Sequence, residues 1–454
     1  MGRLISRIRK LLTGNLEQRL QSEFDECRQK LEHEAALTAY CSASNRQLLE
    51  PLNRDGAPIR VGLTMNLANN FFHLANGLRA AGVEADLILY RSAFDNSLLG
   101  DPRWEIEEVE VTDLDQLDLG VLSSPIPPHV REIEAEPDNP QYEPHPSGKV
   151  LLSSWKNAEK FIACLQQYDI LIVSGPSVAF APFTGKPYIT FPFGGDLMVY
   201  PFGDDHFARL QAAGWRRANG HIFSGGFETK YADILGLGNY THIPHYIDTE
   251  LYRPTEDEKF RRQLLKEHDC DKLFFMPSRH HWPIKCQDRV LQAIANLKDR
   301  GRTGFKVLLT TWGDDFGRSC ALIKELGIDD YCAFVPTMSK PVLRKYFAAA
   351  DLVLDQFALG EYGTLTLEAM AMARPVMLHY KFDDAPPILN AATSEQIAEG
   401  LEFALDNPQK MVELGKRARE WVVKTHGPDV INKYVAALEA TLEGDILPAC
   451  PPFM

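Results

Sequence analysis

The stretch from residue 351 to 380, DLVLDQFALGEYGTLTLEAMAMARPVMLHY, constrains the fold more than any other part of the chain. Its apolar run at 352–354 predicts a short strand that a parallel sheet buries on both faces. Gly360 and Gly363 then predict a loop, and residues 364–373 are mostly strong helix formers. This order places the first amide groups of the helix beyond the carboxyl end of the strand, where they suit an anion such as phosphate.

Two series of alternating strands and helices predict two parallel sheets. The first series comprises a strand at 60–64, a helix at 71–81 and strands at 85–90, 170–174 and 188–191. The second comprises a strand at 272–278, a helix at 289–297 and a strand at 306–310. Residues 113–149 are rich in Pro, Asp and Glu, and we expect a long irregular insertion there. With 454 residues, the chain is long enough for two domains that each bury a core.

Composition excludes several classes of protein. The formal net charge of −14 and the lack of a long basic stripe argue against nucleic acid as a partner. The eight cysteines form no Cys-x-x-Cys pair, so neither a zinc site nor a disulfide framework is indicated, and we expect reduced thiols in a cytoplasm. No apolar run approaches the roughly 18 residues of a membrane span, and the first residues lack a signal-peptide core.

The first twelve residues, MGRLISRIRKLL, form a basic amphipathic pattern. Their apolar side chains share one helical face, and their basic side chains add positive charge. Two interpretations stay open. Residues 1–12 attach the protein peripherally to an anionic membrane surface, or they form a helix that packs on the body of the protein or frays.

The spacing of Gly363 and Glu368, followed by Ala-Met-Ala and Arg-Pro-Val, resembles the donor-site signature of the family 4 glycosyltransferases, which are retaining enzymes of the GT-B fold. The usual Glu-x7-Glu pattern of that family has its first glutamate at the position of Gly360, whereas this chain carries the acid one place later, at Glu361. The resemblance implies that Glu368 accepts hydrogen bonds from the nucleotide ribose and that Glu361 contacts the donor sugar. The alternative is an ordinary strand-loop-helix crossover with a surface glutamate.

The same resemblance implies the other donor-side residues. The amides after Gly363, those of Thr364 and Leu365, hold the diphosphate, and Thr337 lies within the segment that meets the base. Arg279 and Lys285 fall where the family has its diphosphate-binding Arg and Lys, although they are six positions apart here and usually five. Cationic side chains and amides are what an enzyme without a bound metal needs to stabilise a departing phosphate. Two solvated loop cations are the alternative.

Two pairs of side chains invite a metal interpretation that the sequence does not favour. His280 and His281 are adjacent, as are Asp314 and Asp315, but no further ligands stand at a suitable spacing. We therefore expect no metal, and no cofactor other than the nucleotide-diphosphate sugar that serves as donor substrate.

In the first domain, asparagines stand where the family often has a glycine-rich loop. Asn66, Asn69 and Asn70 tolerate left-handed backbone and offer donors and acceptors, so Asn69 and Asn70 are candidates for contacts to the acceptor. Gly-Gly-Asp-Leu at 194–197 resembles a turn on the acceptor side of the family. Asp196 either orients an acceptor hydroxyl or caps the turn that follows it.

The resemblance covers roughly residues 59–440 and implies an α/β protein of the GT-B fold, with two Rossmann-like parallel-sheet domains facing across a cleft. We expect four parts: a helical extension at 1–55, an acceptor-side domain at 56–250, a donor-side domain at 255–427, and a C-terminal helix that crosses back with a tail at 428–454.

The implied function is retaining transfer of a hexose-type sugar from a nucleotide sugar to a carbohydrate or lipid-linked acceptor, without a metal, in glycolipid, polysaccharide or other glycoconjugate synthesis. The expected location is cytoplasmic, with peripheral attachment at the inner face of the membrane as one option. Two alternatives stay open. One is a nucleotide-sugar epimerase or hydrolase of the same fold, and the other is a non-catalytic nucleotide-sugar-binding scaffold.

Overall fold

A computed structural model describes residues 58–91, 95, 97–111, 119–134, 158–226, 228–255 and 257–448. The described chain divides into two compact units. Unit 1 comprises the residues up to Pro102, Pro125–Tyr246 and those from Asp429 onward, and unit 2 comprises Arg103–Ser124 and Ile247–Pro428. The predicted helical extension at 1–55 and the amphipathic start at 1–12 lie outside the described residues.

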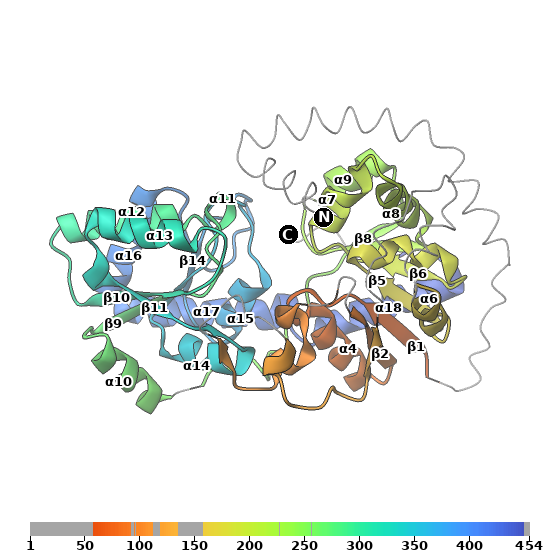
Figure 1. The fold of residues 1–454 in the computed structure, drawn as a ribbon, viewed down its shortest axis with the longest axis horizontal. Helices are drawn as coiled ribbons and strands as arrows, with labels where there is room; N and C mark the ends of the chain where they lie inside the picture. The colour runs from red at the N-terminus through yellow and green to blue at the C-terminus, as the bar shows by residue number, and fades with distance from the viewer. Residues whose placement is uncertain are drawn as a thin grey trace. The chain divides into compact units, whose positions relative to one another are not determined.

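Unit 1 contains a seven-stranded sheet in the order β4-β2-β1-β5-β6-β7-β8, and all neighbouring strands are parallel (Figure 1). Its strands are β1 (Arg60–Thr64), β2 (Glu84–Arg91), β4 (Val130–Glu134), β5 (Ile170–Val173), β6 (Tyr188–Thr190), β7 (Gly220–Phe223) and β8 (Tyr240–His242). Its helices are α4 (Asn70–Ala80), α6 (Ala158–Leu165), α7 (Gly195–Met198), α8 (His206–Arg217), α9 (Glu228–Leu235) and α18 (Asp429–Glu443). The core has two layers, because α4 and α18 pack on one face of the sheet and α6, α8 and α9 on the other.

Unit 2 contains a six-stranded parallel sheet in the order β11-β10-β9-β13-β14-β15. Its strands are β9 (Lys272–Met276), β10 (Phe305–Thr310), β11 (Cys332–Val335), β13 (Leu352–Leu354), β14 (Val376–Leu378) and β15 (Leu389–Asn390). Its helices are α10 (Glu258–Glu267), α11 (Trp282–Lys285), α12 (Gln287–Asp299), α13 (Phe316–Leu326), α14 (Lys340–Ala349), α15 (Thr364–Ala371), α16 (Ser394–Asp406) and α17 (Pro408–His426). Helices α12, α13 and α16 cover one face, and α10, α14 and α15 cover the other (Figure 1).

The predicted βαβ elements are confirmed, with ends shifted by one or two residues. The predicted irregular insertion at 113–149 is wrong in one part, because Val130–Glu134 forms β4, which pairs with β2 at the edge of the sheet. Only Val130 of this strand is buried. The sequence of β4 therefore lacks the apolar alternation by which a strand is predicted.

A segment that precedes β4 in sequence belongs to unit 2. We call Arg103–Val111 the β3 segment, after β3 (Glu110–Val111), which pairs antiparallel with β12 (Thr337–Met338). Trp104 is 1% exposed, so the segment is anchored by burial as well as by strand pairing. The first domain expected from the sequence runs without interruption from 56 to 250. The observed division differs from it, because Arg103–Ser124 belongs to unit 2.

Each sheet reverses its strand order at one place. In unit 1, β1 lies between β2 and β5, and in unit 2, β9 lies between β10 and β13. Open α/β sheets bind ligands beyond the carboxyl ends of the strands at such a switch point. Within the described ranges, none of the helices has the length and apolar character needed to cross a bilayer.

Candidate functional site

The switch point of unit 2 brings the predicted donor-side loops together. Arg279 follows β9 and is exposed, while the loop after β13 leads through Gly363 to the first turn of α15. Because β9 and β13 are neighbours, these loops leave the same edge of the sheet. The first amides of α15 have no acceptors within the helix, so Thr364 and Leu365 present an anion-binding end there.

Lys285 is tied to the loop after β13. Its Nζ donates to Asp355 Oδ1 at 2.5 Å and to Gln356 Oε1 at 3.1 Å. Asp355 is fully buried, and its other oxygen accepts from Thr366 Oγ1 at 2.8 Å. Lys285 therefore has a structural partner, and an ammonium group has a third N–H for a further acceptor.

The structure explains why the acid lies at Glu361 and not one place earlier. Gly360 has φ +77°, and a Cβ there would meet the Lys381 side chain at 2.6 Å. A side chain at this position is disfavoured both by the left-handed backbone and by packing. Glu361 is half-buried, and its backbone carbonyl accepts a hydrogen bond from Gln356 Nε2.

Glu368 forms a buried ion pair that sequence analysis missed. Its side chain is 1% exposed, and Lys340 Nζ donates to both carboxylate oxygens, at 2.6 Å in the case of Oε2. Lys340 is the first residue of α14, after Ser339. A cation at a helix N-terminus opposes the helix dipole, and the Glu368 carboxylate compensates for this effect.

The two histidines after β9 have separate surroundings. His280 is fully buried, its Nε2 donates to the Thr310 carbonyl at 2.9 Å, and its Nδ1 lies 2.8 Å from Ser319 Oγ. Burial lowers the pKa of His280 to about 4, so the ring is neutral and Nδ1 accepts. The Asp315 carboxylate accepts from the Trp282 amide at 2.9 Å and from Arg318. Within the described ranges no three His, Cys, Asp or Glu residues gather as a metal site requires.

Three hydroxyl groups near this edge lack partners. Ser278 follows β9, Thr311 follows β10, and Thr337 lies in β12. The hydroxyl oxygen of each is buried and has no hydrogen-bond partner among the residues that the structure describes. Buried polar groups are normally paired because an unpaired one costs free energy. A polar ligand at this edge would supply such partners, and of the three only Thr337 was predicted.

The asparagine loop of unit 1 is bonded internally. Asn66 Nδ2 donates to Asn69 Oδ1 at 2.6 Å and to the Gly100 carbonyl at 2.7 Å, and Asn66 Oδ1 accepts from the Phe72 amide at 3.0 Å. Asn69 is fully buried, lies at φ +60° and donates to the Asp101 carbonyl. The left-handed backbone expected of asparagine occurs, but the side chains of Asn66 and Asn69 hold the loop itself.

Asn70 and Asp196 lie nearby in unit 1. Asn70 lines a cavity of about 10 Å³, which holds at most one water molecule. Asp196 is buried and accepts from the amides of Gly175 and Phe193, both at 2.9 Å, and from Ser174 Oγ at 3.2 Å. Burial raises the pKa of Asp196. All of these donors precede Asp196 in the chain, so these bonds include neither a cap of the following turn nor an acceptor contact.

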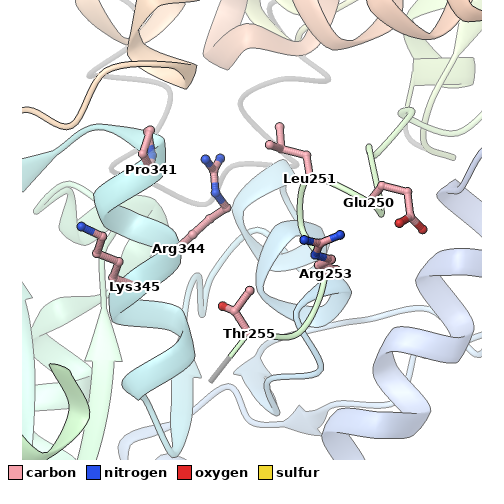
Figure 2. Close-up of a pocket in the computed structure, with 7 residues that line it drawn as sticks. All are labelled: Glu250, Leu251, Arg253, Thr255, Pro341, Arg344 and Lys345. Atoms are coloured by element: carbon pink, nitrogen blue, oxygen red, sulfur yellow. The ribbon is translucent and has the colours of Figure 1, made fainter. Parts of the chain in front are cut away.

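A larger cavity lies along α14. It has a volume of about 390 Å³, and Figure 2 shows Arg344 and Lys345 projecting into view from that helix. Its lining residues are Glu250, Leu251, Arg253, Thr255, Pro341, Arg344 and Lys345. Lys345 pairs with Glu108 at 2.6 Å, and Arg344 lies 4.0 Å from Glu105. The carboxylates of the β3 segment therefore offset much of the positive charge here.

Comparison with known proteins agrees with this architecture. The family model described as Glycosyl transferases group 1 matches residues 256–421. A D-inositol 3-phosphate glycosyltransferase of Mycolicibacterium paratuberculosis is 31% identical over 137 residues, which are 29% of this chain and 29% of that protein. One from Kribbella flavida is 26% identical over 139 residues, 29% of this chain and 32% of the relative. The chain thus spans about a third of the length of the curated relatives it matches.

Solved structures show the fold over most of the chain. The Anabaena protein Alr3699/HepE in complex with UDP-glucose has a TM-score of 0.61 at 15% identity, and the match covers 84% of this chain and 100% of that one. Sucrose-phosphate synthase from Thermosynechococcus elongatus has a TM-score of 0.58 at 16% identity, with 85% and 99% covered. The predicted GT-B fold is confirmed, and residues 256–421 match the family model of the glycosyl transferases group 1.

Proposed function

We propose that this protein transfers a hexose-type sugar from a nucleotide-diphosphate sugar to a carbohydrate or lipid-linked acceptor, with retention of the anomeric configuration. The bond between the sugar's anomeric carbon and the diphosphate breaks, and the acceptor oxygen bonds to that carbon on the same face. The proton of the acceptor hydroxyl goes to the departing phosphate. No covalent bond to the protein is required.

The observation that carries the proposal is the switch point of unit 2, which lies within the residues that match the family. An exposed guanidinium at Arg279, the ammonium of Lys285 and the amides at the start of α15 share one edge of the sheet. Such groups stabilise the charge that develops on a leaving diphosphate. Unpaired hydroxyls at the same edge, including that of Thr337, favour a polar ligand beside it.

The donor-side roles are proposed from the family resemblance, and these positions are compatible with them. Arg279, Lys285 and the amides of Thr364 and Leu365 hold the diphosphate, Glu368 accepts hydrogen bonds from the ribose, and Glu361 contacts the sugar. Thr337 lies on the base side. Burial is the main cause of the raised pKa of the Tyr380 phenol, and the half-buried Glu361 carboxylate adds a smaller contribution, so the two side chains are near one another.

The acceptor is proposed only by class. Asp196 and Asn69 are committed to hydrogen bonds within unit 1, so an acceptor would meet their loops mainly through backbone and neighbouring side chains. The exposed Leu67, in the same loop as Asn69, offers an apolar contact of the kind that a lipid-linked sugar provides.

The test is a thermal-shift series with UDP, GDP and ADP and their glucose conjugates, followed by product analysis with and without an acceptor. UDP comes first because the Anabaena neighbour was solved with UDP-glucose. A ligand that binds the folded state raises its melting temperature by mass action. We expect one base to give a shift that Arg279→Ala and Glu368→Ala both lose. Turnover of the donor without acceptor would favour an epimerase or hydrolase, and binding without any turnover would favour a scaffold.

A further inference from the structure

The ion pair between Lys340 and Glu368 joins two helices of unit 2. Lys340 opens α14, and Glu368 lies in the second turn of α15. The Lys340 side chain is 11% exposed and donates to both oxygens of the carboxylate. This contact holds the carboxylate group in place, and a carboxylate can accept from more than one donor.

Nothing in the local helix favours a cation where Lys340 stands. The partial positive charge of the α14 N-terminus repels the ammonium group, and removal from water adds a further cost. The carboxylate of Glu368 offsets the repulsion by the helix dipole and the cost of desolvation only if the two side chains are held at contact distance. The pair therefore depends on what fixes the first turn of α14.

The β3 segment fixes that turn. The Ser339 amide donates to the Val109 carbonyl at 2.9 Å, and the Val109 amide donates to Ser339 Oγ at 2.9 Å. Immediately before Ser339, β12 pairs with β3. Farther along, Tyr252 donates to Glu105 at 3.1 Å. The contacts of Val109 and β3 tie an early part of the chain to the helix end that carries Lys340, and the contact of Glu105 ties the same segment to Tyr252.

We propose that Lys340 is a positioning residue for the nucleotide: it orients the Glu368 carboxylate toward the 2′- and 3′-hydroxyls of the ribose, and the β3 segment holds Lys340 in place. This inference rests on the proposed function, in which Glu368 accepts from those hydroxyls. Lys340 itself does not contact the substrate, so its loss acts on ribose recognition and leaves diphosphate recognition intact.

The experiment compares the affinity of UDP with that of 2′,3′-dideoxy-UDP by calorimetry, and GDP and ADP with their dideoxy forms if UDP does not bind. The native protein is expected to prefer UDP roughly tenfold. Lys340→Met is expected to lose that preference while its affinity for dideoxy-UDP stays within twofold of native. Lys345→Met, farther along the same helix and paired at the surface with Glu108, is the matched control and keeps the preference.

The outcomes separate the two proposals. If the native protein shows no preference, or Glu368→Gln retains it, the ribose role of Glu368 fails, and with it the site proposed above. If Glu368→Gln loses the preference and Lys340→Met keeps it, only the role of Lys340 is overturned. An equal loss of both affinities in Lys340→Met also overturns it. Should Lys340→Met not fold, Lys340→Gln retains a hydrogen-bond donor to the carboxylate and is judged by the same ratio, with an intermediate value expected.

Discussion

The two switch points have the same topology but different surroundings. In unit 1, a side chain at Gly175, which follows β5, would meet Met65 Sδ at 1.8 Å, so the side chain after β1 fills the space beside β5. The neighbouring polar groups of Asn66 and Asp196 are bonded within the unit. In unit 2, the corresponding loops leave Arg279 exposed and buried hydroxyls such as that of Ser278 unpaired.

This difference shows that topology marks where a ligand can bind, whereas the side chains decide whether it does. The asparagine loop and Asp196 of unit 1 are bonded within that unit, whereas three hydroxyls at the edge of unit 2 lack partners among the described residues. Substitutions at the first should therefore change stability, and substitutions at the second should change affinity. Four experiments test that division.

The largest effect is expected at Lys285, where a substitution in unit 2 should change stability as well as affinity. Lys285→Met leaves the buried Asp355 without its cation, and such a loss costs about 3–5 kcal/mol of unfolding free energy. Urea unfolding measures it. The double variant Lys285→Met with Asp355→Asn removes both charges and should regain most of the stability. Full stability of the single variant would show that the 2.5 Å contact contributes little.

Arg279→Ala sharpens the comparison. The guanidinium is exposed and has no ion-pair partner within the described part of the chain, so the melting temperature should stay within a degree or so of native. Loss of a charge-assisted contact to phosphate costs about 1.5–3 kcal/mol, or roughly 10–150-fold in nucleoside diphosphate affinity. Calorimetric titration measures the affinity. Weaker folding with unchanged affinity would reverse the assignment.

Asn66→Ala is the counterpart in unit 1. It removes hydrogen bonds to Asn69, Gly100 and Phe72 inside the protein, for which about 1–3 kcal/mol of stability is expected. Nucleoside diphosphate affinity should not change. The two variants control for each other, since Arg279→Ala should lower affinity without changing stability and Asn66→Ala should lower stability without changing affinity. A loss of nucleotide affinity in Asn66→Ala would mean that the unit 1 edge also serves the donor.

The smallest effect concerns pH. The pKa of His280 is about 4 in the folded protein and near 6.5 when the ring is solvated. Between these values the unfolded chain binds a proton that the folded chain does not, so stability falls as pH falls through this window. His280→Gln keeps a donor for the Thr310 carbonyl and removes the titration. Lowering the pH from 7 to 5.5 should then cost about 1 kcal/mol less than in the native protein, measured by urea unfolding. Equal losses would place the acid sensitivity elsewhere.

The sequence was sufficient for the central elements of the fold. Short apolar runs such as Leu352–Leu354 are typical of strands buried in a parallel sheet. The glycines that follow this run indicated a loop. It was insufficient for β4 and for the pairing of β3 with β12. Both depend on partners far away in the chain, and neither segment has enough apolar residues to reveal its partner.

The site divides in the same way. Residue types and spacing led to Arg279, Lys285 and Glu368, and the structure places all three in unit 2. Their partners could not be predicted, because Lys340 and Asp355 are recognisable as partners only when α14 and β13 are packed. For Asn69, the predicted backbone conformation occurs, but its hydrogen bonds were decided by the nearby carbonyl of Asp101.

The crossing of the chain between the units has a consequence for biosynthesis. The α4 face of unit 1 packs against α18, where Ile431 fills the space over Gly77, yet α18 is translated after the whole of Ile247–Pro428. At 5–20 residues per second, a ribosome needs roughly 10–40 s to make that intervening stretch. For that time, the apolar face of α4 lacks the cover that α18 later provides. We therefore expect the nascent first unit to need protection from aggregation until α18 has been made.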